Sequence, residues 1–222
     1  RAPARRRVCG RRRWWRRGSW HDPPVPVRLV PGFSQPASVW DDVVAARDPA
    51  ALVESRTALV LIYSREGRHA DAYRLLGELV AAYPRNRLCV REQGSAAIRA
   101  GKHSEAEAIL SAGLAALDRD RRARMPGERG LWLYKRGLAR FGRDKRAESA
   151  ADLQEALRNT PPEWVRGRAL LTLGKIADLN GQRAEAVTNY RTAREVGTQA
   201  RDTAGAAEAT RLLSRPYVRP RT

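Results

Sequence analysis

The residues of this chain that could do chemistry are few, and two of its three histidines come first. His69 and His103 are 34 positions apart, and each is followed two residues later by a carboxylate, Asp71 and Glu105. Histidine and carboxylate side chains can both bind metal ions, and equivalent positions in neighbouring structural units could approach each other. Polar residues in a turn before a helix give the same pattern. We therefore predict no metal site and no cofactor.

A second group with chemical potential is the N-terminal run of arginine and tryptophan, RRRWWRR. Guanidinium groups bind phosphates, and indole rings stack on nucleic-acid bases. This pattern predicts contact with nucleic acid as an alternative function. An anionic membrane surface and a basic segment without a specific role remain open alternatives. The residues concerned are Arg11, Arg12, Arg13, Trp14, Trp15, Arg16 and Arg17.

The whole chain of 222 residues is strongly basic, with 43 Lys and Arg against 24 Asp and Glu and a formal charge of +19. Arginine-favouring codons in a GC-rich genome explain part of this excess. The sign of the charge still favours acidic partners, attracted over a screening length of roughly 10 Å at moderate salt.

Cysteine use and hydropathy indicate an ordinary soluble chain. Cys9 and Cys89 are too few and too far apart to predict a disulfide framework or a zinc site. No apolar run reaches the roughly 18 residues that a membrane span needs, and no signal-peptide core occurs. We expect a soluble protein, cytoplasmic by default. The chain begins with Arg rather than Met, which leaves open whether residues 1–36 are a native start.

Composition divides the chain into three regions. Residues 1–24 hold nine arginines and one acidic residue, which predicts disorder, and a Pro-rich extended stretch follows to residue 36. Residues 37–214 are helical by pattern, beginning at a capping box formed by Ser38 and Asp41. Residues 215–222 form a basic C-terminal tail. The helices are predicted at 52–66, 69–82, 87–100, 104–117, 128–141, 146–158, 162–180, 183–196 and 202–213.

Glycine and alanine recur at fixed spacings within this helical region. Gly174, Gly181 and Ala186 are separated by seven and five residues, and Gly94, Gly101 and Ala106 have the same spacing. Small residues on two facing helices allow the helices to cross closely. We therefore expect each early glycine to face the small residue of the second helix, so that Gly94, Gly137 and Gly174 face Ala106, Ser149 and Ala186. The glycine between the two helices ends the first one in a left-handed conformation.

These spacings resemble the tetratricopeptide repeat, a 34-residue helix–turn–helix unit. Units would start at residues 53, 87, 130 and 167, which implies one insertion, RRARMPGER, after the second unit and another within or after the third. The resemblance implies an all-α solenoid of about four units, and the helix at 202–213 would cap its end. Departures are Val60 in place of a small residue and an irregular turn in the third unit, where Gly142 arrives two residues early. Thr160 and Glu163 predict a capping box before the fourth unit.

Proteins of this repeat family usually bind peptides or partner helices on the concave surface lined by their first helices. The resemblance therefore implies a non-enzymatic scaffold with a basic, partly apolar groove, suited to an acidic protein or peptide because arginine holds carboxylates bidentately. The terminal-carboxylate clamp of one variety of the family is not matched here in either register. The predicted lining residues are Leu61, Arg65, Arg91, Ser95, Arg99, Tyr134, Leu138, Arg168, Leu171 and Lys175.

Residues 25–45 carry a second, shorter resemblance. The stretch VRLVPGFSQPASVW is similar to the strand–turn–helix that opens α/β-hydrolases. No G-x-S-x-G elbow follows, so a nucleophile would have no exposed position and no base. Ser34 is expected to be a turn residue, and the chain is not expected to be an enzyme.

Overall fold

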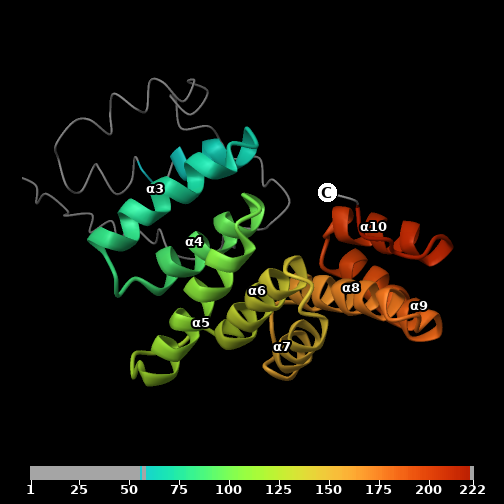
Figure 1. Ribbon diagram of the computed structural model, residues 1–222. Helices are drawn as coiled ribbons and strands as arrows, with labels where there is room; N and C mark the ends of the chain where they lie inside the picture. The colour runs from blue at the N-terminus through green and yellow to red at the C-terminus, as the bar shows by residue number, and fades with distance from the viewer. Residues whose placement is uncertain (1–55, 57–58, 221–222) are drawn as a thin grey trace, which may run out of the picture.

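The computed structural model describes residues 56 and 59–220, and every regular element among them is a helix. The all-α expectation is confirmed. A helical stretch at 59–65 precedes eight further helices (Figure 1). Their bounds are α3 His69–Ala82, α4 Arg87–Arg99, α5 His103–Arg119, α6 Glu128–Gly142, α7 Arg146–Arg158, α8 Glu163–Leu179, α9 Arg183–Gln199 and α10 Thr203–Ser214. The predicted ranges differ from these mainly at the ends of α5 and α9, which are two and three residues longer.

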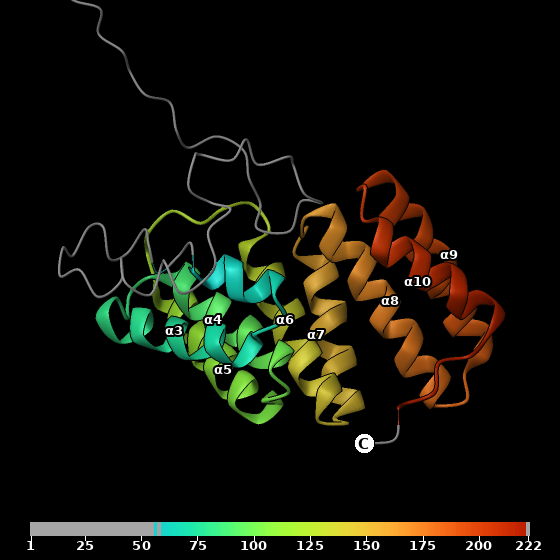
Figure 2. The same ribbon diagram turned by 90° about the horizontal axis from the view of Figure 1, so that it is seen from above.

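The helices form antiparallel pairs that stack in chain order. Each helix from α3 to α10 packs on the helices before and after it, as Figures 1 and 2 show. The first helices of successive units also touch directly, α4 on α6, α6 on α8 and α8 on α10. The described residues make no comparable contact between α5 and α7 or between α7 and α9. The first helices therefore form one continuous layer, and we call the surface of α4, α6 and α8 the first-helix face.

In the second, third and fourth units, the two helices pack closely at a glycine of the first helix. A Cβ atom built on Gly174 would lie 2.5 Å from Cε1 of Tyr190, and one on Gly94 would lie 2.6 Å from Cγ of Leu110. The third unit has the same contact between Gly137 and Leu153. The predicted pairing of Ser149 with Gly137 is confirmed, because Ser149 Oγ donates to the carbonyl of Gly137 at 2.7 Å, and Ala106, Ser149 and Ala186 are all buried. The bulkier residue one turn further along the second helix fills the space, because a glycine leaves room for it.

The turns between paired helices share one backbone geometry. Gly67, Gly101 and Gly181 have φ values of +73°, +76° and +76°. The amide of the residue after each glycine donates to a carbonyl five residues back, as Gln182 does to Ala177 at 2.8 Å. This is the Schellman closure, which satisfies the last carbonyls of a helix and favours glycine in the left-handed position.

The turn of the third unit is regular, so the predicted irregularity was wrong. Asp144 occupies the position of the missing glycine with φ +61°, and Lys145 donates to the carbonyl of Arg140 at 3.0 Å. Aspartate tolerates this conformation better than most residues. Gly142 belongs to α6, where a side chain would collide with the ring of His103.

The start of α8 also differs from expectation. Its N-cap is Pro162, no side chain caps the helix, and Thr160 adopts a φ of +42°. The predicted capping box of Thr160 and Glu163 is therefore wrong. A side-chain cap does occur at α4, where Asn86 accepts from the amides of Leu88 and Cys89.

Two glycines of α8 give a matched test of the helix packing. Gly174→Ala should destabilise the protein by about 1–3 kcal/mol, because the new methyl group overlaps Tyr190. Gly167→Ala in the same helix meets nothing closer than 3.4 Å, so it should be neutral or stabilise by up to about 1 kcal/mol through helix propensity. Urea unfolding of both variants measures the difference. Equal stabilities would contradict the packing.

Candidate partner-binding site

The structure places the ten predicted groove residues in three different environments. Leu61, Arg65 and Arg99 are exposed, and Leu138, Arg168 and Lys175 are partly buried. Arg91, Ser95, Tyr134 and Leu171 are buried. The ten residues therefore do not form one evenly exposed strip. The polar residues among them differ mainly in the side chains of this chain with which they pair.

Buried cations gather on the first-helix face where α4 meets α6. Lys135 of α6 is 3% exposed, donates to Ser95 Oγ and lies 3.4 Å from both carboxylate oxygens of Glu92. Arg91 Nε donates to the same carboxylate at 3.2 Å. Arg99 follows Ser95 by one helical turn on the same side of α4. We call Arg91, Glu92, Ser95, Arg99 and Lys135 the cationic cluster, since three cations surround one carboxylate.

The charge imbalance of this cluster appears in the pKa of Lys135. Burial lowers the pKa of this ammonium group from 10.5 to about 8. Glu92 opposes the shift, whereas Arg91 and Arg99 add to it. A further negative charge beside Lys135 would therefore stabilise its protonated form. Arg91 and Lys135 are buried with Glu92 between α4 and α6, whereas Arg99 is exposed.

Two other predicted groove cations are used to hold the last helix. Arg168 binds the carboxylate of Asp202 through two hydrogen bonds of 2.6 and 2.8 Å. Lys175 pairs with Glu208 of α10 at 2.7 Å. Bidentate pairing of this kind fixes geometry as well as contributing energy. At the C-terminal end of the first-helix face, these cations therefore attach α10 to α8.

Acidic hubs between the helices are features that the sequence reasoning missed. Glu107 of α5 meets three cations of the next unit, Arg140, Arg143 and Lys145. Their hydrogen bonds outweigh the effect of burial, so the pKa of Glu107 lies below its usual value. Asp152 binds Arg136 and Arg140 in the same region. In the sequence, Glu107 and Asp152 look like ordinary surface residues of their helices. The network is visible only in the tertiary contacts.

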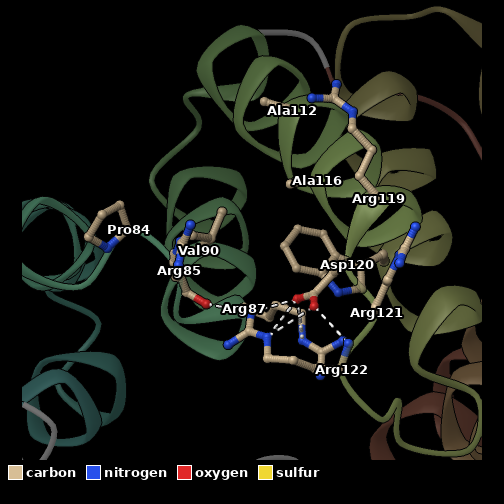
Figure 3. Close-up of a pocket in the computed structure, with 12 residues that line it drawn as sticks. Pro84, Arg85, Arg87, Val90, Ala112, Ala116, Arg119, Asp120, Arg121 and Arg122 are labelled. Carbon is tan, nitrogen blue, oxygen red and sulfur yellow. Dashed lines mark hydrogen bonds and ion pairs between the residues drawn. The ribbon is translucent and has the colours of Figure 1, made fainter.

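A pocket of about 800 Å³ lies at the start of α4 and the end of α5 (Figure 3). Apolar side chains contribute to its walls, including Val90, Ala112, Ala116 and Trp132. The third unit starts at residue 130, nine residues later than the 34-residue spacing from 87 would place it. Arg121 and Arg122 of this insertion line the pocket, so the departure from the repeat helps to form it.

Arginines dominate the polar part of this pocket. Arg122 binds Asp120 and donates to the carbonyl of Arg85 at 2.9 Å, and Arg87 donates to the carbonyl of Ala123 at 2.7 Å. Hydrogen bonds from Arg122 hold the pKa of Asp120 well below its usual range. Arg85, Arg119 and Arg121 also line it. Cations thus outnumber carboxylates beside an apolar wall.

The other candidate residues have simpler settings. Asp71 accepts from Arg68, and Glu105 accepts from Lys102 and Tyr73. The described residues contain no group of three or more His, Cys, Asp or Glu arranged to hold a metal ion. None of the helices placed in residues 56 and 59–220 is both apolar enough and long enough to span a bilayer. The arginine–tryptophan stretch, the hydrolase-like segment and the Ser38 capping box lie outside the described residues.

Comparison with known proteins supports the fold. A scan against protein-family models and a search of curated proteins give no match. Among solved structures, the chain is similar to MamA from residue 41 to its end, from Desulfovibrio magneticus RS-1, and to the ArsTM double mutant of MamA RS-1. Each has 16% identity and a TM-score of 0.55, and the match covers 73% of this chain and 84% of that one. The protein therefore has the fold of a tetratricopeptide-like helical repeat solenoid.

Lys135 gives a pH-dependent test of the cationic cluster. Its pKa is about 8 in the folded chain and near 10.5 ordinarily, so between these values the unfolded chain binds more protons. The difference in the free energy of unfolding between the unchanged chain and Lys135→Met should therefore rise with pH in this window, by up to about 1.4 kcal/mol per pH unit. Below pH 8 this difference should not change with pH. Urea unfolding of both proteins from pH 7 to 10 measures the difference. A difference that stays constant throughout would contradict the assigned environment.

Proposed function

We propose that the chain is a tetratricopeptide-type scaffold that binds an acidic partner protein or peptide on its first-helix face and catalyses no reaction. The observation that carries this proposal is the cationic cluster, where Arg91, Arg99 and Lys135 face a single carboxylate, Glu92. A partner carboxylate would relieve the repulsion among these cations. Partly buried Leu138 adds apolar surface on α6, and exposed Leu61 adds it on the helical stretch at 59–65.

The mechanism of such a scaffold is the display of side chains from rigid helices. Arg91, Ser95 and Arg99 stand one turn apart on α4, and Lys135 is held by α6, so little ordering is needed when a partner binds. Ionic contacts at the edge of an interface mainly increase the association rate and fix orientation. The pocket beside Arg119 and Arg121 offers a second cationic surface with an apolar wall.

A charge reversal tests the acidic-partner proposal. Arg99→Glu should weaken binding of a short fluorescein-labelled Glu/Leu peptide by about tenfold, or about 1.4 kcal/mol, because it replaces attraction with repulsion. Arg194→Glu on the exposed side of α9 is the matched control, with the same change in net charge. Fluorescence anisotropy measures both affinities. An equal loss in the two variants would show that only net charge matters and would overturn the assigned face.

The second candidate function is binding of nucleic acid through the N-terminal segment. The observation that favours it is the arginine–tryptophan run within residues 1–24. Deleting residues 1–24 should then abolish retention of a labelled single-stranded RNA and leave binding of the Glu/Leu peptide unchanged. A full-length chain that retains no RNA at moderate salt would exclude this function.

A further inference from the structure

The segment after α10 returns across the ends of two earlier first helices. Residues 216–220 have neither helix nor strand structure, and Arg215 already has an extended backbone. Figure 2 shows this segment, in red, running from α10 back toward α6 and α7. Its contacts are with Phe141, Asp144, Lys175 and Asp178, which we call the tail site.

Tyr217 is held at the end of α8. Its amide donates to Oδ2 of Asp178 at 2.7 Å, and Nζ of Lys175 lies 5.3 Å from the centre of its ring. The ring also packs on Phe141, with 5.9 Å between ring centres. Asp178 is in turn fixed by Tyr190 and Arg183, so the carboxylate that receives the segment is already oriented.

Arg219 is held at the end of α6. It forms an ion pair of 3.0 Å with Asp144, donates to the carbonyl of Phe141 and lies over the ring of Phe141. Val218, between the two anchoring residues, is 77% exposed. This alternation is that of an extended chain, in which residues two apart point to the same side. Pro216 and Pro220 flank the anchors and favour an extended backbone.

We propose that the tail site is a recognition site for an extended, basic segment of a partner protein with the pattern aromatic–x–Arg between prolines, and that the chain's own residues 215–220 occupy it in competition. Asp144, which also holds Arg146, pairs with the arginine of such a segment, and buried Asp178 accepts its backbone amide. The resident segment is tethered, so it competes at an effective concentration on the order of millimolar. This site is separate from the cationic cluster, and the charged side chain that it binds is the cation Arg219.

The test uses the full chain and a fluorescein-labelled peptide with the sequence of residues 215–222, RPYVRPRT. Changing Tyr217→Ala and Arg219→Ala together in the protein should vacate the tail site. The peptide should then bind at least about tenfold more tightly than it binds the unchanged chain, because the tethered competitor is weakened. A peptide with alanine in place of its tyrosine and its first internal arginine should bind neither protein.

A second substitution in the vacated chain assigns the binding to Asp144. Asp144→Asn removes the charge and suits the left-handed backbone at φ +61°, and it should weaken peptide binding by about fivefold. Asp118→Asn, which removes the partner of Arg129 on α5–α6, is the control and should have no effect. Binding of the Glu/Leu peptide should be unchanged in all these variants, so failure here would not bear on the proposed function.

Several outcomes would overturn the proposal. The first is that the double variant keeps its melting temperature and binds the peptide no more tightly than the original chain does. The second is that the alanine peptide binds the double variant as tightly as the unchanged peptide does. If the double variant unfolds, Arg219→Ala alone should still raise peptide affinity about threefold, and no increase would refute the site. A concentration-dependent dimer of the original chain that Arg219→Ala abolishes would assign the site to a second copy instead.

Discussion

The contact on which the structure depends is a glycine of one helix covered by a bulky side chain of its pair. Gly94 with Leu110, Gly137 with Leu153 and Gly174 with Tyr190 repeat this contact in three successive units. Because the same approach recurs, each pair presents its first helix in the same direction, and the first helices can touch one another. A methyl group at the contact would separate the two helices and disturb the surface that they present.

The contacts between neighbouring units decide which charged residues of the first-helix face are already paired. Near the C-terminal end, Arg168 and Lys175 pair with Asp202 and Glu208, and Asp144 and Asp178 pair with Arg146 and Arg183. Near α4, three cations share Glu92, and the pKa of Lys135 falls to about 8. Most charged side chains between the units are therefore already paired within the chain, and the cluster of Arg91, Arg99 and Lys135 around Glu92 is where cations outnumber carboxylates on the first-helix face.

The repeat made most of the fold predictable. Apolar periodicity between glycines and prolines predicted every helix from α3 to α10 within a few residues. The 34-residue period predicted how these helices pair and stack, because each unit buries its apolar face in the same way. The turn at Asp144 was missed because the pattern sought a glycine there. The pocket was missed because it depends on a non-repeating insertion. Contacts of Tyr217 and Arg219 join residues 39 and 78 positions apart, a distance over which no local pattern carries information.

The most direct measurement is amide hydrogen exchange of the full chain with and without the Glu/Leu peptide. If the first-helix face holds the partner, exchange should slow in α4 and α6, with the largest change around Ser95 and Lys135. Exchange in α5 and α7 should stay the same, because these helices form the other layer. Protection confined to α5 and α7, or no protection at a peptide concentration that saturates binding, would contradict the account.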